Sequence, residues 1–358
     1  MPTNRIGAVA VPADLTTALT PQWLTAALQP RFPGTEVCSV TRGPIVERLS
    51  TNARFAIDCA GEAPTDLPTR LCIKGYFSDV GRAIAHVGEP EATFYRDLAE
   101  PSGIRTLRSV YADVDPQTRH GVVITEDMVA AGGEFLDPAD VFTTEQVSEA
   151  LAELAKLHAF TWMSPRWSAE AWLQPRLGRA AQVWGEKRTL EVMTANLEGG
   201  NGSEIPRRAR DARSLLEAHR RVGARSAGSS IPGWCVIHGD AHVGNLIRDG
   251  DGRPGLVDWQ LVQRGRWQID VGYLIAATLD SEQRRRSELD LLRHYLECLS
   301  SYGISVPSFD QARVALPDGM IHGFFLWSIT TKVTPDVIAL LLARLGTAVA
   351  DHLTEVNP

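Results

Sequence analysis

The 358-residue sequence has few cysteines, few lysines and no long run of apolar residues. Its five cysteines are odd in number, scattered and mostly set in apolar surroundings. They indicate buried free thiols in a reducing compartment rather than a disulfide framework. No stretch reaches the length that spans a bilayer, and the N-terminus lacks a basic region followed by a long apolar core. We therefore expect a cytoplasmic protein with no membrane partner.

An excess of positive charge is also missing. The formal net charge is −7 at pH 7, whereas binding to a phosphate backbone needs a basic excess, so we expect no nucleic-acid partner. The composition, with 44% hydrophobic and 22% charged residues, is that of a globular protein. The chain is long enough for two lobes with a sizeable core. Neither an internal repeat nor a low-complexity tract stands out, and the oligomeric state stays open.

The most informative segment is 234–260, which reads WCVIHGDAHVGNLIRDGDGRPGLVDWQ. Its apolar runs predict two short strands around a polar turn that carries Asp240 and Asn245, with Asp258 at the end of the second strand. This spacing is typical of phosphoryl transfer, in which one carboxylate accepts a proton from the attacking hydroxyl. An amide oxygen and a second carboxylate hold Mg²⁺ against the nucleotide phosphates. The pattern therefore predicts a base at Asp240 and metal ligands at Asn245 and Asp258.

Two other interpretations fit part of this segment. Asp, His and Asn residues between strands often bond to their own backbone as turn formers. Asp240 and Asn245, however, precede the apolar Leu246 rather than further turn residues. A sharper alternative is a metal-dependent hydrolase, because His238, Asp240 and His242 alternate as ligands on one strand do, and zinc favours imidazole ligands.

The first third of the chain predicts an antiparallel sheet. Strand-like runs are separated by polar turns or by turns with glycine or proline, and they cover 36–47, 53–60, 70–77, 104–111 and 121–125. The turn after the first run carries Ser50, Thr51 and Asn52. These small polar residues would let backbone N–H groups and hydroxyls approach a triphosphate. A plain hairpin turn fits the segment equally well, and no G-x-G-x-x-G sequence occurs there.

Lys74 is one of four lysines and lies within an apolar strand. A buried lysine needs an anionic partner, although the solvent face of a half-exposed strand would also accommodate it. The segment 79–98 has helical periodicity with a break near Pro90, and it places Glu91 seventeen residues after Lys74. Glu91, or Glu89 in its place, would then hold the lysine toward the α and β phosphates.

The small lobe ends after its last strand, at Glu126 to Met128. The backbone of such a strand end offers N–H and C=O groups to an adenine edge, and Met128 would form an apolar wall. A simple linker is compatible with the same residues. We therefore expect an N-terminal nucleotide-binding lobe over 1–127. A mostly helical C-terminal lobe for catalysis and substrate binding would follow over 128–358.

Two polar residues of the second lobe have expected structural roles. Asp270 lies just ahead of the apolar run 271–277, where a buried carboxylate would accept backbone N–H bonds from the turn around Asp240. Capping of a helix is an equally compatible role. His158 falls on the apolar face of a helix that begins after Thr143, and we interpret it as a hydrogen-bonded core histidine.

These motifs resemble the aminoglycoside phosphotransferase and choline kinase superfamily. The resemblance rests on His238-Gly-Asp-Ala-His-Val-Gly-Asn, on Asp258-Trp-Gln, on Glu91-Ala-Thr-Phe-Tyr and on Leu154-Ala-Lys-Leu-His-Ala, and it is greatest to the ecdysteroid-kinase-like (CHK-type) branch. It implies an α+β, bilobal protein-kinase-like fold with an N-terminal antiparallel sheet lobe and a larger helical lobe. The chain departs from the pattern in the turn at Ser50, Thr51 and Asn52, which lacks glycine.

The resemblance also implies residue roles. Asp240 would be the catalytic base, Asn245 and Asp258 the Mg²⁺ ligands, Lys74 and Glu91 the phosphate-positioning pair, Glu126 to Met128 the adenine hinge, and His238 a scaffold residue. The leading hypothesis is thus an ATP- and Mg²⁺-dependent kinase that phosphorylates a hydroxyl of a small metabolite, a steroid-like compound or an antibiotic. The metal-dependent hydrolase and a catalytically inactive kinase-like binding module remain the alternatives.

Overall fold

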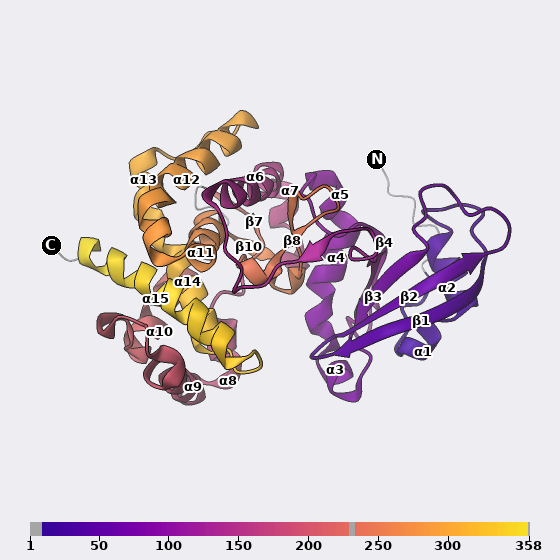
Figure 1. Ribbon diagram of the computed structural model, residues 1–358, viewed down its shortest axis with the longest axis horizontal. Coiled ribbons are helices and arrows are strands. Elements are labelled where there is room, and N and C mark those ends of the chain that lie inside the picture. The colour runs from indigo at the N-terminus through magenta and orange to yellow at the C-terminus, as the bar shows by residue number, and fades with distance from the viewer. Residues whose placement is uncertain (1–8, 229–232, 357–358) are drawn as a thin grey trace.

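The computed structural model describes residues 9–228 and 233–356, and Figure 1 shows two parts side by side along its long axis. The first part contains a five-stranded antiparallel sheet in the order β1-β2-β3-β5-β4. Its strands are β1 (Val37–Glu47), β2 (Thr51–Cys59), β3 (Arg70–Gly75), β4 (Ser109–Val114) and β5 (Gly121–Glu126). Four of the five expected strands lie where the sequence predicts them. The strand expected over 104–111 begins only at Ser109.

One face of this sheet is covered by α1 (Leu15–Ala18) and α2 (Pro21–Leu28). Thr20 caps α2 by accepting a hydrogen bond from the Trp23 N–H, and Pro21 occupies the first turn, where its missing N–H costs nothing. Leu24 and Leu28 of this helix pack against the alternate residues of β2 and β3 that point to the same side. On the opposite face, α4 (Glu89–Asp97) packs against β4 and β5, and a cavity lies against the remaining part.

The helix expected over 79–98 is divided into α3 (Asp79–Ala83), a 3-10 turn (Ala85–Gly88) and α4 (Glu89–Asp97), with α5 (Ala99–Ser102) after it. A close backbone approach explains the break. A Cβ on Gly121 of β5 would lie 2.3 Å from the Gly88 oxygen, so the chain must pass β5 without side chains at that point. Pro90 then fits the first turn of α4, and the face that carries Glu91 is buried.

The second part is mostly helical. Short strands, β6 (Glu134–Phe135), β7 (Trp234–Ile237), β8 (Leu246–Arg248), β9 (Pro254–Leu256) and β10 (Gln263–Arg266), form two small antiparallel sheets. The helices are α6 (Thr144–Thr161), α7 (Pro165–Ser168), α8 (Arg179–Trp184), α9 (Glu186–Glu198), α10 (Ala212–Ser226), α11 (Gln268–Thr278), α12 (Ser281–Ser301), α13 (Phe309–Ala315), α14 (Pro317–Ser328) and α15 (Pro335–Val356). Among the residues described, none of the helices is both long and apolar enough to cross a bilayer.

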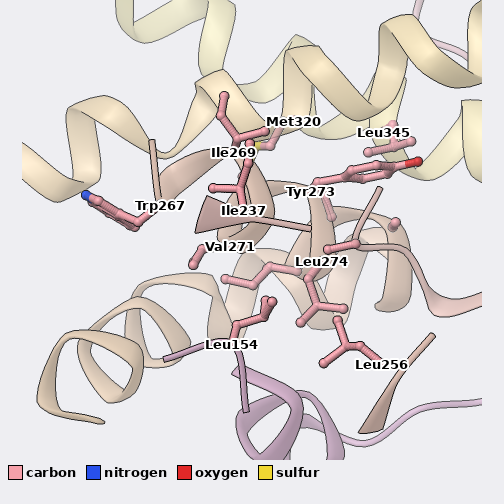
Figure 2. Packing of buried hydrophobic residues seen from close by; sticks show 14 of the residues in the cluster. Leu154, Ile237, Leu256, Trp267, Ile269, Val271, Tyr273, Leu274, Met320 and Leu345 are labelled. Atoms are coloured by element: carbon pink, nitrogen blue, oxygen red, sulfur yellow. The ribbon is translucent and has the colours of Figure 1, made fainter. Parts of the chain in front are cut away.

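Helix α11 forms the centre of this part, because each of its eleven residues is buried. Figure 2 shows side chains of α11, such as Tyr273 and Leu274, among Leu154 of α6, Met320 of α14 and Leu345 of α15. A helix that is apolar on all sides is stable only when neighbours surround it completely. The loop that α11 supports therefore rests on a fully buried helix.

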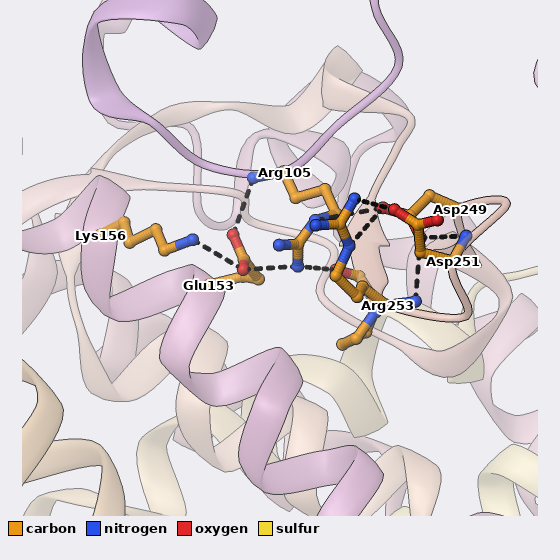
Figure 3. Close-up of polar contacts among 7 residues, drawn as sticks. Arg105, Glu153, Lys156, Asp249, Asp251 and Arg253 are labelled. Atoms are coloured by element: carbon orange, nitrogen blue, oxygen red, sulfur yellow. Dashed lines mark hydrogen bonds and ion pairs between the residues drawn. The ribbon is translucent and has the colours of Figure 1, made fainter.

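The two parts are joined by a network around Arg105 (Figure 3). Its backbone N–H and its Nη1 each donate to Glu153 of α6, at 2.8 and 2.7 Å, while Nη1 also donates to the Pro254 oxygen at 3.0 Å. The Arg105 oxygen accepts the Leu256 N–H at 3.0 Å. The backbone of Arg105 thus pairs with the second part instead of with the sheet, which fits the start of β4 at Ser109.

Candidate active site

The loop between β7 and β8 carries Asp240, and a buried carboxylate determines its shape. Asp270 of α11 accepts the backbone N–H of His238 at 2.6 Å and of Gly239 at 2.9 Å. The Asp270 carboxylate also bonds to Nε2 of the His158 ring at 3.2 Å. Both structural roles expected for Asp270 and His158 are confirmed. Gly239 has φ +80°, and a Cβ there would lie 2.5 Å from the Leu261 oxygen, so the tight turn requires glycine.

His238 is committed to the scaffold. Its Nε2 donates to the Val257 oxygen at 2.9 Å, and its Nδ1 accepts the Asp240 N–H at 3.2 Å, so neither ring nitrogen is left for a metal. The His242 Nδ1 likewise accepts the Gly244 N–H. No cluster of three or more metal-binding side chains occurs in the described part of the chain. This geometry does not support the hydrolase interpretation of His238, Asp240 and His242.

Asp240 is oriented through both carboxylate oxygens. Oδ1 accepts the Tyr273 hydroxyl at 3.1 Å, and Oδ2 accepts the Asn245 side-chain N–H at 3.3 Å. Trp327 of α14 donates its indole N–H to the Tyr273 oxygen at 2.7 Å, so a chain of hydrogen bonds runs from α14 to the carboxylate. Burial raises the pKa of Asp240 to about 6, closer to neutrality, where a general base is most effective.

The opposite side of the Gly239 peptide is held by a pair of histidines. His322 Nε2 donates to the Gly239 oxygen at 2.8 Å, and its Nδ1 accepts from His219 Nε2 at 3.0 Å. His219 in turn stacks on Phe325, with ring centroids 3.8 Å apart. Burial lowers the pKa of both histidines, most strongly that of His219, where the neighbouring His322 adds to the effect. Both rings are therefore neutral at pH 7.

The sequence analysis did not find Tyr273, Trp327, His219 or His322. A signal was nevertheless present, because Tyr273, His322 and Trp327 lie in mostly apolar helices and His219 lies on the apolar face of α10. Buried hydroxyl, indole and imidazole groups need partners, which would have marked these residues as members of a polar network. Their partners are distant in sequence, so the network itself is visible only in the fold.

Asp258 meets the two charged residues of the first part. The Lys74 ammonium lies 2.7 Å from Glu91 and 2.9 Å from Asp258. Burial alone would lower the pKa of Lys74, but the two carboxylates outweigh it and hold this pKa well above its ordinary value. Glu89, the alternative partner, pairs with Arg119 instead. The structure thus brings together Lys74, Glu91 and Asp258 from three separate segments.

The backbone conformation and the neighbouring residues of Asp258 hold its carboxylate next to Lys74. Asp258 has φ 64° and ψ 63°, a left-handed conformation that few non-glycine residues adopt and that aspartate tolerates better than most. The next residue, Trp259, stacks on Phe94 of α4 with ring centroids 3.8 Å apart. Because α4 also carries Glu91, the contact between Trp259 and Phe94 places Asp258 beside the Lys74–Glu91 ion pair.

A cavity of about 730 Å³ lies between the open face of the sheet and this carboxylate. Of the residues predicted to contact nucleotide or metal, those that line it are Ser50, Asn52, Lys74, Glu91, Glu126, Met128, Asn245 and Asp258. Thr51 does not line it. Its side chain is 1% exposed and points to the core face of the sheet, because neighbours along a strand face opposite sides. Asp240 adjoins the cavity through its contact with Asn245.

The donors at this end of the cavity fit a hard divalent cation. Asn245 uses its side-chain nitrogen to bond to the Asp240 oxygen at 2.9 Å, which leaves its amide oxygen for a metal. Asp258 supplies a carboxylate. Oxygen ligands of this kind suit Mg²⁺. A wider surface hollow of about 820 Å³ lies against α9 and α10 and contains none of these residues.

Comparisons with known proteins identify a family and a fold. A family model described as "Phosphotransferase enzyme family" matches residues 91–312. The structure resembles a choline kinase from Cryptosporidium parvum, with a TM-score of 0.56 and 12% identity, over 94% of this chain and 97% of that chain. This likeness shows the fold alone, and it confirms the expected bilobal protein-kinase-like fold.

Two further solved structures are more distant in shape. A choline kinase from Streptococcus pneumoniae has a TM-score of 0.46 and 13% identity, over 88% of this chain and 94% of its own. An aminoglycoside 2'-phosphotransferase in complex with GDP has a TM-score of 0.49 and 12% identity, over 94% of this chain and 99% of its own. A search of curated proteins found no match.

Proposed function

Because the chain belongs to the phosphotransferase enzyme family, we propose that it transfers the γ-phosphoryl group of Mg-ATP to a hydroxyl of a small molecule. The observation that carries this proposal is the arrangement around Lys74. Its ammonium contacts Glu91 and Asp258 at one end of a cavity that Asn245 also lines. Phosphoryl transfer depends mainly on positioning and charge neutralisation, which such a constellation provides.

The proposed roles follow the chemistry of each group. Glu91 holds the Lys74 ammonium, which binds the α and β phosphates. Asp258 and the amide oxygen of Asn245 hold Mg²⁺, which neutralises charge on the phosphates when it is bound. Asp240 accepts the proton of the acceptor hydroxyl, because its pKa of about 6 leaves it deprotonated at neutral pH yet basic enough to act.

The division of labour between the two parts is also a proposal. Residues 1–127 would form the nucleotide-binding lobe, and residues 128–358 the catalytic and acceptor-binding lobe. Glu126 and Met128 line the cavity beyond Lys74 on the sheet. We assign this end to the adenine, with the Met128 side chain as an apolar wall. Ser50 and Asn52 would contact the phosphates, whereas the buried Thr51 would not.

A phosphorylation screen tests the reaction. The purified protein is incubated with Mg-ATP and a library of hydroxylated metabolites, steroids and antibiotics, and products are detected by a mass increase of one phosphoryl group. We expect at least one acceptor and slow ATP hydrolysis without an acceptor. If the protein neither binds Mg-ATP nor hydrolyses it, the proposal fails and an inactive binding module is favoured.

A second measurement addresses the cofactor directly. We expect Mg-ATP to raise the melting temperature of the protein, because a ligand that binds only the folded state stabilises it. Elemental analysis should find no bound zinc. Stoichiometric zinc together with no response to Mg-ATP would contradict the kinase assignment and revive the metal-dependent hydrolase.

A further inference from the structure

The hairpin of β1 and β2 presents alternate side chains to the cavity. Those that line it are Pro44, Val46 and Arg48 on one side of the turn and Ser50, Asn52 and Arg54 on the other. The intervening Thr51 and Ala53 are buried on the core face, at 1% and 0% exposure. This period of two is that of an extended hairpin. The hairpin therefore forms a continuous wall of the cavity out to its tip.

The register of the sheet places Arg48 along the cavity. Asn52 pairs with Lys74, and Arg54 pairs with Cys72, which in turn pairs with Thr125 near the end of β5. Going along β2 from Arg54 to Asn52 therefore leads from the proposed adenine end of the cavity to Lys74, the proposed phosphate-binding lysine. Arg48 lies beyond Lys74 in that direction, at the tip of the hairpin, where the terminal phosphate would be.

The charges of the cavity leave Arg48 available. Lys74 is shared by two carboxylates, and Arg54 lies 3.6 Å from Asp127. Within residues 9–228 and 233–356, Arg48 forms no ion pair, and it is exposed. A guanidinium offers a planar fork of donors that matches phosphate oxygens. Arg48 is therefore the one cavity-lining cation in the described structure with no anion of its own.

The turn at the hairpin tip differs from a glycine-rich phosphate-binding loop. The Arg48 N–H donates to the Ser50 oxygen at 3.0 Å, and Glu47 pairs with Thr51 in the strand register. No glycine occurs between residues 44 and 60. Glycine-rich loops bind phosphate through free backbone N–H groups, whereas this turn has no glycine and uses the Arg48 N–H within itself.

We propose that Arg48 binds the terminal phosphate of the nucleotide, so that a side chain performs the function that backbone N–H groups perform in glycine-rich loops. The inference rests on the proposed function, because it takes the cavity as the site of a nucleoside triphosphate. It adds a binding residue that distinguishes triphosphate from diphosphate. Before transfer Arg48 would hold the γ-phosphoryl group, and after transfer the diphosphate product would lose this contact.

Calorimetric titration of the full chain tests the proposal with three probes: the β,γ-imido analogue of Mg-ATP, Mg-ADP and adenosine. In Arg48→Ala we expect the affinity for the analogue to fall roughly tenfold, the usual consequence of losing a charged hydrogen bond. The affinity for Mg-ADP should fall by less than about threefold, and that for adenosine should not change, because only the terminal phosphate is contacted. Arg48→Lys keeps the charge but not the planar fork of donors, so its affinity for the analogue should lie between those of the wild type and Arg48→Ala.

A matched control is Arg42→Ala. Arg42 is exposed on β1, the strand that leads to Arg48, but it does not line the cavity, so its loss removes one positive charge without a phosphate contact. We expect its affinity for the analogue to stay within about twofold of wild type. Equal losses for analogue and diphosphate in Arg48→Ala, or no loss at all, would overturn the inference while the proposed function stands. No nucleotide binding by the wild type would overturn both.

Discussion

The two walls of the cavity are built differently. The loop from His238 to Asn245 has no exposed residue and is held by α11 and α14 through Asp270, Tyr273 and His322. The β1–β2 hairpin opposite is largely exposed along β1. Within the described chain, the side chains of Arg48 and Ser50 at its tip form no hydrogen bond with a helix.

On the proposed function, this difference would separate chemistry from nucleotide binding. A base must be held in one geometry relative to the acceptor, since small displacements cost much of the rate. A phosphate-binding hairpin must instead admit and release a ligand in each cycle, which favours the less stable parts of a fold. We therefore expect substitutions around Asp240 to change turnover and stability, and substitutions in the hairpin to change nucleotide affinity.

The strongest test of the catalytic wall is Asp240→Asn. The amide cannot accept a proton, so we expect the turnover number to fall by about 10³- to 10⁴-fold, in line with the loss of a general base. Affinity for Mg-ATP should remain close to that of the wild type, because Asp240 does not line the cavity. Steady-state kinetics and calorimetry measure the two quantities. A variant that keeps normal turnover would contradict the assigned role.

Asp270→Asn should have the next largest effect, on stability. The carboxylate is 0% exposed and accepts two backbone N–H groups, and an amide would turn an N–H group toward one of them. We expect the free energy of unfolding to fall by about 3 kcal/mol, the typical cost of unpaired buried polar groups near a broken network. Urea denaturation measures it. Asp66→Asn, at an exposed carboxylate, serves as a control with little expected change.

The pH dependence of stability tests the histidine pair. Burial depresses the folded-state pKa of His219 far below the unfolded value, so the folded state binds fewer protons in acid. Stability from this group is present above about pH 6.5 and is lost by about 1.4 kcal/mol per pH unit as the pH falls further. His219→Phe keeps the stacking on Phe325 but removes the titrating group. We therefore expect the free energy of unfolding to depend less steeply on pH between about pH 5 and 6.5, by up to the equivalent of one bound proton.

The smallest expected effect concerns the orientation of the base. Tyr273→Phe removes the hydroxyl that donates to Asp240 Oδ1 and accepts from Trp327. We expect the turnover number to fall by about fivefold to tenfold, consistent with one lost hydrogen bond, with the KM for ATP unchanged. Equal losses in turnover and in nucleotide affinity would indicate a general structural role rather than orientation of the carboxylate.

The order of the site residues along the chain could be predicted because local rules govern it. Asp240, Asn245 and Asp258 lie in one strand-turn-strand unit, and the spacing of such a unit is readable in one dimension. The membership in a phosphotransferase family is confirmed, while assignment to the CHK-type branch stays a prediction. The residue roles also stay predictions until variants are measured.

Other features could not be predicted from local rules. Thr51 was expected at the phosphates, but a strand that begins at Thr51 rather than at Ala53 turns its side chain into the core. The late start of β4 depends on the bond between Arg105 and Leu256, which are far apart in sequence. Arg48 gains its position only from the register of the hairpin over the cavity.

The sequence alone determined which chemical groups are present and which short segments carry them, because strand, turn and helix patterns depend on neighbours along the chain. Only the tertiary structure decided which groups meet. Lys74 contacts Glu91 of α4 and Asp258, and Asp240 contacts Tyr273 of α11, because packing brings these elements together. Such contacts depend on burial and on the directions of side chains from distant elements, and a one-dimensional pattern does not encode these directly.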